Sequence, residues 1–498
     1  MAKNESSVGL LLASPPADLE LNQWLHRELR AAILDRRLKP GARLPSTRQL
    51  ARQYQISRGT VTTAFEQLRD EGYLEGQIGS GTYVAKDIPD GLLQARGMAG
   101  ISKRTAHSRA TLSSRGERIS STSLAIKPVT HAGRAFRAYH PALDVFPLHL
   151  WSRMVARRSR QSSRILLAGG EPAGYRPLRE ALAGYLGSMR GVKCSQEQVV
   201  IVSGIQQALD IVARLVLDPG DAVWMENPGY IGASAALRAA GGEMVPIPVD
   251  KNGLNVRTGV NSCPQARLAY VTPAHQFPLG VVLSLERRLA LLNWANEARA
   301  WIFEDDYDSE YRYSGRPFPA LQGLDQSGSV IYAGSFNKML FPSLRLGYLV
   351  LPPRLVEPFV AARSIVDRYP PVLDQAVVCD FMVEGYFGQH IRRMREIYAE
   401  RRLALIDAAR SELQGLLRVD DLPAGLHTNG WFECGISDRQ ATAAASAAEI
   451  EVMSLSSFGV GRRVPNGLML GFATVNPAAT KAAVTRLAKV LENLKRNL

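Results

Sequence analysis

The sequence predicts a multidomain protein in which a small α+β module precedes a large α/β domain that ends in a smaller α+β subdomain. At 498 residues the chain is too long for a single hydrophobic core. Helical spacing and two strand-like runs mark its start, and short apolar runs alternate with helical stretches in the rest. The expected divisions are a flexible leader at 1–18, the module at 19–86, a basic flexible linker at 87–140 and the large domain at 141–498, with its subdomain from about 356.

The composition narrows the class of partner and the compartment. A net charge of +14 favours an acidic partner such as nucleic acid or phosphate, although a merely basic surface gives the same count. The four cysteines are scattered and form neither a disulfide framework nor a metal-ligand spacing, which favours a reducing cytoplasm. No apolar run is long enough to span a bilayer and no signal-peptide pattern is present, so we expect a cytoplasmic protein without a membrane partner.

The module is predicted to contain three helices and two strands. Apolar residues recur at helical spacing from Leu21 to Leu34, and Pro40 and Gly41 end this helix. Ser46 is a candidate N-cap for a second helix over Thr47–Gln53, and Ser57 for a third that runs to about Glu71. Two strands are expected on either side of a glycine-rich tip, at 72–75 and 81–84.

The segment that follows is predicted to be a tether. Residues 87–140 hold nine Lys and Arg against three acidic residues, with many Ser, Ala and Gly and little apolar periodicity. A solvated flexible linker is the expected structure, and its basic residues could also contact DNA.

The large domain is predicted to be built on a mostly parallel sheet. Its apolar runs are brief, bounded by turn residues and separated by helical stretches. These runs are Val199–Ser203, Ala222–Met225, Ala269–Thr272, Trp301–Glu304 and Val330–Ala333. A strand at Leu468–Ala473 and an amphipathic helix from Pro477 are expected to end the chain.

Lys338 stands in the most informative run of the chain, between Gly334 and Tyr348. Its amine can form a Schiff base, Ser335 places a hydroxyl three residues before it, and Arg345 places a guanidinium seven residues after it. An aldehyde cofactor with a phosphate group, pyridoxal 5'-phosphate, needs these groups in one pocket. Asp305 and Asp306 could instead hold a metal, but no further ligands cluster near them, and we predict no metal site.

The N-terminal motifs resemble the winged helix-turn-helix of GntR-type regulators over roughly residues 19–85. They are Arg43–Ala51, Ile56–Val61, Gly72-Tyr73-Leu74 and Gly79–Val84. The resemblance implies binding to a double-stranded DNA operator, with the start of the third helix in the major groove. A small helical cap with ordinary surface arginines is the alternative. The residues expected at DNA are Ser46, Arg48, Ser57, Arg58, Thr60, Gly79 and Gly81.

The rest of the chain, from about residue 140, resembles the class I aminotransferase domain of MocR-type regulators, a pyridoxal-phosphate-dependent transferase of fold type I. The motifs are Ser203–Asp210, Glu226–Tyr230, Thr272–Pro278, Glu304–Asp308 and the Lys338 run. The resemblance implies a Schiff base at Lys338, a partner for the pyridine nitrogen at Asp305, and a hydrogen bond from Tyr307 to the phenolic oxygen of the ring.

The same resemblance implies a phosphate cup at the start of a helix. Gly204, Ile205 and Gln206 lie between a strand and a helix, and Ser335 and Arg345 are expected to complete the cup. Tyr230 is expected to line the ring face, and His275 to lie near the same edge. Each of these two residues could equally be a packing residue.

Three positions depart from the aminotransferase pattern. Gly169 stands where a tyrosine usually reaches the phosphate of the neighbouring subunit, and Leu279 stands where a small hydroxyl residue is usual. Met469 stands where an arginine usually clamps the carboxylate of the substrate. Arg462 and Arg463 lie just upstream and are candidates for contacting an effector, or solvated residues.

We expect a homodimeric transcription regulator whose cofactor domain senses pyridoxal phosphate itself or a small amine effector, for which the family suggests 4-aminobutyrate or taurine. The alternative is an active aminotransferase that carries a DNA-binding module. The nearly complete winged helix-turn-helix and the absence of the arginine that usually binds the substrate carboxylate favour the regulator. We expect slow, partial transaminase chemistry at most.

Overall fold

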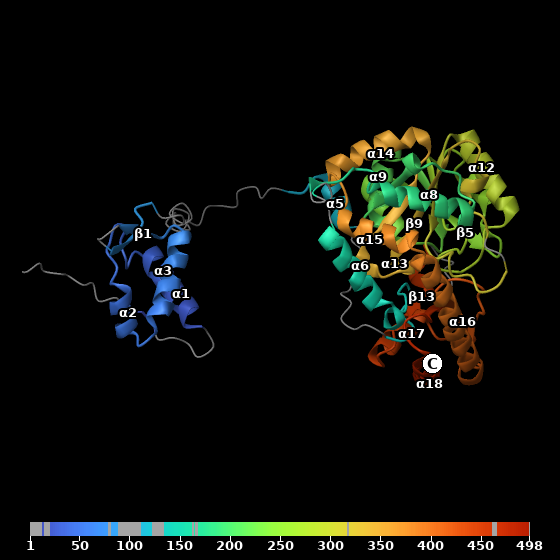
Figure 1. Ribbon diagram of the computed structural model, residues 1–498. Helices are drawn as coiled ribbons and strands as arrows, with labels where there is room; N and C mark the ends of the chain where they lie inside the picture. Colours follow the sequence, from blue (N-terminus) through green and yellow to red (C-terminus); the bar gives the residue numbers. More distant parts are fainter. Residues whose placement is uncertain are drawn as a thin grey trace, which may run out of the picture. The chain divides into compact units, whose positions relative to one another are not determined.

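The structure is a computed structural model and describes residues 12–13, 20–77, 81–87, 111–121, 134–161, 164, 168–315, 318–460 and 466–497. The chain divides into two compact units, Met1–Thr111 and Leu112–Leu498 (Figure 1). Each unit has its own hydrophobic core.

The first unit has the predicted winged helix-turn-helix architecture. Its elements are α1 (Leu21–Leu34), α2 (Thr47–Gln53), α3 (Arg58–Asp70), β1 (Leu74–Gln77) and β2 (Gly81–Val84). α1 and α2 both pack on α3, and Leu29, Val61 and Leu68 are fully buried between them. β1 and β2 pair antiparallel, with Leu74 opposite Val84, so the wing is closed by apolar residues at its base.

Two residues of the predicted flexible leader, Leu12 and Ala13, form hydrogen bonds with the helices of the first unit. The backbone N–H of Leu12 donates to the hydroxyl of Tyr54 at 3.0 Å. The indole N–H of Trp24 donates to the carbonyl of Ala13 at 3.1 Å. Leu12 and Ala13 therefore belong to the folded module, because a buried Trp24 needs an acceptor that its own helix does not provide.

The predicted linker also differs from the structure in its second half. A helix, α5 (Ser114–Ser121), contacts α10 of the second unit. Phe136 is fully buried and pairs with Gly471. Residues 134–140 are therefore part of the large unit, and the expected boundary at 140 is wrong. A single short segment added to a distant strand leaves no periodic pattern in the sequence.

The second unit is built on an eight-stranded sheet in the order β3-β10-β9-β8-β7-β4-β5-β6. The strands are β3 (Val199–Val202), β4 (Ala222–Asn227), β5 (Glu243–Asp250), β6 (Gly253–Leu254), β7 (Leu268–Val271), β8 (Trp301–Asp306), β9 (Val330–Ser335) and β10 (Gly347–Val350). The strands β9, β8, β7, β4 and β5 are each parallel to their neighbours within this group. β10 runs antiparallel to β3 and β9, and β6 runs antiparallel to β5. All five predicted strands are present.

Helices cover both faces of this sheet, as a mostly parallel sheet requires (Figure 1). They are α6 (Leu148–Gln161), α8 (Arg176–Arg190), α9 (Ile205–Val216), α10 (Ile231–Ala240), α11 (Val256–Ser262), α12 (Leu285–Ala298), α13 (Phe336–Met339), α14 (Pro353–Val366) and α15 (Val372–Val383). Apolar residues of α9, α10 and α14 form one core against the sheet, and those of α11 and α12 form another.

The C-terminal subdomain is a four-stranded antiparallel sheet with helices. Its elements are α16 (Tyr386–Glu412), β11 (Leu417–Val419), β12 (His427–Phe432), α17 (Asp438–Ala447), β13 (Met453–Ser454), β14 (Gly467–Gly471) and α18 (Pro477–Arg496), in the strand order β11-β12-β14-β13. Near the boundary expected at about 356, α14 packs on α9, and α15 packs on α6, α8 and α16. The start of the subdomain stays a prediction.

In the described part of the chain, no helix combines the length and the apolar character needed to cross a membrane.

Replacing Phe136 with alanine should destabilise the second unit by about 3–5 kcal/mol, because a fully buried ring would leave a cavity. Thermal or denaturant unfolding of the full chain measures this loss. Ile119→Ala, in the exposed α5, is the matched control and should change stability little. Equal stability of both variants would show that residues 134–140 are not part of the core.

Candidate functional site

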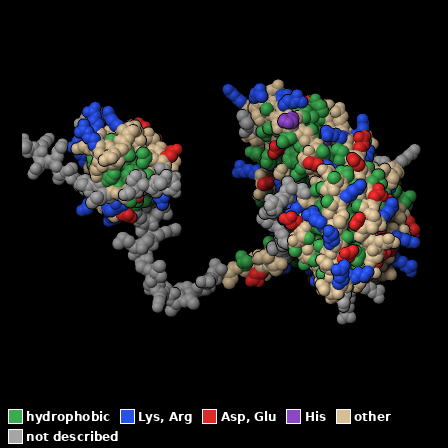
Figure 2. Space-filling model, turned by 90° about the horizontal axis from the view of Figure 1, so that it is seen from below, with side chains coloured by type: hydrophobic (Ala, Val, Ile, Leu, Met, Phe, Trp, Pro, Cys, Tyr) green, Lys and Arg blue, Asp and Glu red, His purple; other side chains and the backbone are tan. Residues whose placement is uncertain are grey.

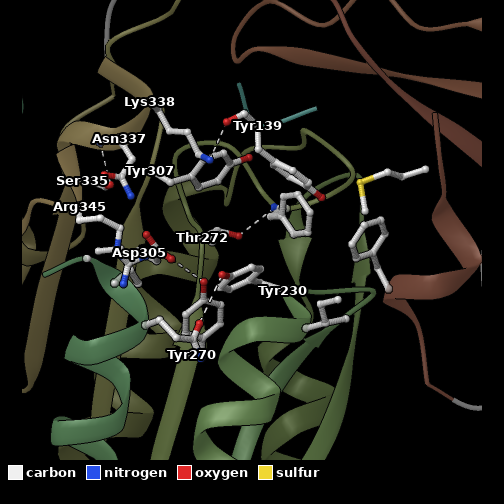
Figure 3. A pocket seen from close by; sticks show the side chains of 17 residues that line it. Tyr139, Tyr230, Tyr270, Thr272, Asp305, Tyr307, Ser335, Asn337, Lys338 and Arg345 are labelled. Carbon is white, nitrogen blue, oxygen red and sulfur yellow. Dashed lines mark hydrogen bonds between the residues drawn. The ribbon is translucent and has the colours of Figure 1, made fainter. Parts of the chain in front are cut away.

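A cavity of about 290 Å³ lies where the carboxyl ends of β7, β8 and β9 meet the N-terminal ends of α9 and α10 (Figure 3). This is the edge at which open α/β sheets bind their ligands. The cavity is lined by Tyr139, Gly204, Ile205, Gln206, Tyr230, Ile231, Tyr270, Thr272, Phe277, Asp305, Tyr307, Ser335, Asn337, Lys338, Arg345, Met453 and Phe458. Nine of the ten residues predicted for the cofactor are in this set.

Lys338 enters the cavity from α13, directly after β9. Its ammonium group donates a hydrogen bond to the carbonyl of Tyr139 at 2.8 Å and lies 5.3 Å from the centre of the Tyr139 ring. Burial lowers the pKa of Lys338 to about 8, although the Asp308 and Asp305 carboxylates act in the opposite direction. The amine is therefore much closer to its nucleophilic, uncharged form at neutral pH than an exposed lysine is.

Asp305 faces the cavity with one carboxylate oxygen that has no donor among the described residues. It lies within β8 and is buried. Its Oδ2 accepts a hydrogen bond from the Tyr270 hydroxyl at 2.7 Å, whereas Oδ1 is buried and unpartnered. Burial raises the pKa of Asp305 to about 7. A ligand with a cationic ring N–H would supply the missing donor and hold Asp305 ionised.

The other end of the cavity suits an anion. Gly204 is the N-cap of α9, at φ +112°, where an L side chain would be strained. The amides that follow it open a twelve-residue helix and have no acceptor within that helix. Ser335, Asn337 and Arg345 are grouped beside them (Figure 3), and the Asn337 Oδ1 is buried without a partner among the described residues.

His275 is the one predicted cofactor residue that the structure places away from the cavity. Its Nδ1 lies 2.9 Å from the Tyr307 hydroxyl and 3.1 Å from both carboxylate oxygens of Asp308. It therefore contacts Tyr307 from behind. Tyr230, the other residue with two open roles, does line the cavity, with its hydroxyl 3.5 Å from the Gln206 side chain.

Several residues of the cavity were not singled out from the sequence. Tyr139 fell within the expected linker and carries no local pattern that marks it. Tyr270 lies in an apolar strand, where its hydroxyl looks like core packing. Asn337, Thr272 and Phe277 stand inside the quoted motifs, so a closer comparison of those motifs could have found them.

The three departures occupy distinct places. Met469 is fully buried in β14, and its sulfur accepts from the Tyr139 hydroxyl at 3.8 Å. It packs in a cluster with Phe277 and Phe458, which line the cavity, whereas Met469 is not among the lining residues. Gly169 lies against Tyr369, whose hydroxyl would be 3.2 Å from an added Cβ.

The remaining predicted positions take other partners or lie outside the described residues. The backbone N–H of Leu279 donates to the Gln276 side chain. Asp306, considered for a metal pair, instead pairs with Arg190 at 2.8 Å and accepts from the Tyr332 hydroxyl at 2.6 Å. Arg462 and Arg463 lie outside the described residues.

In the first unit, the predicted hydroxyl residues start the helices. Ser46 caps α2 and forms a capping box with Gln49. Ser57 caps α3 by accepting from the Thr60 amide at 3.0 Å, and the two hydroxyls lie 2.9 Å apart. These bonds fix the helix starts at which Arg48 and Arg58 are exposed.

A basic residue outside the set predicted to contact DNA lies against the wing. Gly81 has φ +117°, and an added Cβ would lie 3.1 Å from the Arg43 side chain, so Arg43 lies against the wing. Gly79 lies outside the described residues. Lys and Arg side chains outnumber acidic ones on the face of this unit seen in Figure 2, which is the electrostatic character of a nucleic-acid interface.

Two known families match the chain in this order. Residues 22–84 match the family of bacterial regulatory proteins called gntR, and residues 148–487 match aminotransferase class I and II. A probable rhizopine catabolism regulatory protein, MocR of Rhizobium meliloti, is 41% identical over 96% of this chain and 95% of its own length. The transcriptional regulator TauR of Rhodobacter capsulatus is 32% identical over 96% of this chain and 98% of its own.

Solved aminotransferase structures resemble the second unit. The α-aminoadipate aminotransferase LysN of Thermus thermophilus, in complex with N-(5'-phosphopyridoxyl)-L-leucine, has a TM-score of 0.71 and 27% identity. It covers 78% of this chain and 98% of its own length. The kynurenine aminotransferase of Pyrococcus horikoshii has a TM-score of 0.68 and 27% identity, covering 81% and 99% of the two chains.

Arg58→Ala should weaken binding to a specific DNA site by about 1–3 kcal/mol and relax the preference for one base pair, because Arg58 opens the helix expected in the major groove. Footprinting and titration at fixed salt concentration measure both effects. Arg27→Ala, an exposed arginine of α1, is the control. An unchanged footprint for Arg58→Ala would contradict this role.

Proposed function

The chain belongs to the MocR-type regulators, which join a GntR-type DNA-binding domain to an aminotransferase-like domain, and from this premise we propose that it regulates transcription by sensing pyridoxal phosphate, or an amine that adds to it, at Lys338. Members of this class depend on pyridoxal phosphate, and so do the aminotransferases that share the fold of the second unit. The proposal concerns what the cofactor site does for the regulator.

The residues of the cavity fit the cofactor at each of its functional groups. Bound pyridoxal phosphate supplies an aldehyde that links reversibly to amines and a ring that withdraws electrons. Lys338 would hold the aldehyde carbon, and the free Oδ1 of Asp305 would hold the pyridine N–H. The α9 amides, with Ser335 and Arg345, would hold the phosphate. Tyr230 and Phe277 would enclose the ring, and Tyr307 would face its phenolic oxygen.

The observation that carries the choice of sensing over turnover is the buried Met469. A thioether in an apolar cluster offers no anchor to a carboxylate, and the cations that line the described cavity are Lys338 and Arg345. Both are already assigned, one to the aldehyde and one to the phosphate. An amino-acid substrate would therefore lack the bidentate clamp that orients it for proton abstraction. Retention of Lys338, Asp305 and Tyr307 is what favours the alternative of an active aminotransferase.

We further propose a homodimer that presents two winged helices to two half-sites of an operator. Ile365 and Val366 are 86% and 45% exposed at the end of α14. They are followed by Tyr369, which contacts Gly169. An exposed apolar patch of this kind supports contact with a second copy. The relative named for rhizopine catabolism supports a catabolic operon as the target.

The cofactor-free protein should capture pyridoxal phosphate at a rate that rises with pH and levels off above about pH 8, rather than near the ordinary lysine value of 10.5. Below its pKa the Lys338 amine is protonated and cannot attack, so lowering the pKa moves the rise to lower pH. Stopped-flow absorbance at the visible band measures the rate. Lys338→Ala should give no visible band. A rate still rising at pH 10 contradicts the assigned environment, and a band that survives in Lys338→Ala contradicts the linkage.

Met469→Arg should speed conversion of the bound cofactor to its amine form by an amino acid, on the order of tenfold, because a guanidinium would anchor the carboxylate. Loss of the visible band in single-turnover experiments gives the rate, and thermal unfolding checks the fold. Met469→Leu keeps the packing and should leave the rate as it is. If a folded Met469→Arg variant reacts no faster, the clamp argument fails.

A further inference from the structure

A buried polar triad joins one residue of the cavity lining to two residues behind it that have no role in the assignments above. It consists of Asp308, His275 and Tyr307. Asp308 and His275 are each 2% exposed. The Nδ1 atom of His275 lies 2.9 Å from the Tyr307 hydroxyl and 3.1 Å from each oxygen of Asp308, while its Nε2 has no partner among the described residues.

The position of the imidazole proton decides what the phenol can do. A neutral imidazole carries one N–H and one acceptor nitrogen. With the proton on Nε2, Nδ1 would accept from Tyr307, Asp308 would lose its histidine donor, and a buried N–H would be unpaired. With the proton on Nδ1, His275 donates toward Asp308, and only a neutral acceptor is left unpaired. The second arrangement costs less, because leaving a buried carboxylate without a donor is the larger penalty.

Packing holds the ring in this orientation. An added Cβ at Gly425 would lie 2.1 Å from the His275 Cε1, and one at Gly280 would lie 3.1 Å from Nε2. The His427 ring stands 5.3 Å away, centre to centre, and burial lowers the pKa of His427 to about 3, so it adds no charge at neutral pH. His275 therefore has Asp308 as its charged neighbour among the described residues in contact with it.

With the proton on Nδ1, the Tyr307 oxygen faces an N–H and its own hydrogen is free to turn into the cavity. Burial raises the pKa of Tyr307 well above 10.0, and the neighbouring Asp308, Tyr139, Asp305 and Glu226 raise it further, so the phenol stays protonated. Asp308 also acts on Lys338, whose pKa it raises against the effect of burial, as Asp305 does.

We propose that Asp308 and His275 are positioning residues: they turn the Tyr307 hydroxyl so that it donates to the phenolic oxygen of the cofactor. This inference rests on the proposed linkage at Lys338. It assigns a function to two buried residues that do not line the cavity.

The role of Asp308 is tested with Asp308→Asn, which is nearly isosteric. The neutral amide no longer favours the proton on the Nδ1 atom of His275, so the Tyr307 hydroxyl loses its direction. Tyr307→Phe should then weaken the binding of pyridoxal phosphate much less than the roughly tenfold loss expected in the natural chain. Glu310→Gln is the matched control. It removes a buried carboxylate two residues further along, which accepts from Tyr185 instead. In this background the effect of Tyr307→Phe should stay. An undiminished effect in Asp308→Asn overturns the inference.

The orientation of Tyr307 is tested with a double-mutant cycle on the dissociation constant of pyridoxal phosphate. Tyr307→Phe should weaken binding roughly tenfold in the natural chain and much less in a His275→Leu background, where the phenol is no longer directed. His275→Asn keeps an N–H near the Nδ1 position and should restore part of the Tyr307 effect. Equal effects of Tyr307→Phe in both backgrounds contradict the proposal. A missing visible band in the unmutated protein would instead contradict the linkage at Lys338.

Discussion

The placement of a carboxylate and an amine at one edge of the sheet is the constraint on which the rest of the site depends. Asp305 and Lys338 come from neighbouring parallel strands, β8 and the end of β9, whose register is fixed by their ladder. Burying either charged group alone is costly. Burial raises the pKa of Asp305 and lowers the pKa of Lys338, so it favours the neutral form of each group. A cofactor that offers an aldehyde to Lys338 and a ring N–H to Asp305 would relieve both costs.

Much of the fold could be predicted because apolar runs and helix caps are patterns of neighbouring residues. The five apolar runs, the caps at Ser46 and Ser57 and the Lys338 run could all be recognised from neighbouring residues. The pairing of Phe136 with Gly471 could not, since it joins segments far apart in the chain and leaves no periodicity. The same limit hid Tyr139 and misplaced His275, whose contacts with Tyr307 and Asp308 arise only when two loops meet. α14 and α15 likewise have ordinary helical sequences, and only the structure shows which helices they pack against.

Met469 stands in an apolar cluster at the position where an aminotransferase usually has a carboxylate-binding arginine. This difference bears on the proposed regulatory function. Phe277 and Phe458 give the cavity an apolar wall, and Met469 packs with them. Because a regulator must release its ligand unchanged to report a concentration, weak orientation of the reacting bonds is an advantage in such a protein. Under the proposed function, residues that would hold the cofactor together with Met469 in place of a carboxylate anchor would favour reversible occupancy over turnover.

The carbonyl of Tyr139 accepts a hydrogen bond from the Lys338 ammonium group, and Tyr139 belongs to the segment 134–140 of the second unit. Any molecule that bonds to the Lys338 nitrogen would therefore compete with this hydrogen bond. The segment 134–140 is held at its other end by backbone pairing of Phe136 with β14. Occupancy of the cavity at Lys338 would thus act first on a short backbone segment that is also paired with the C-terminal sheet.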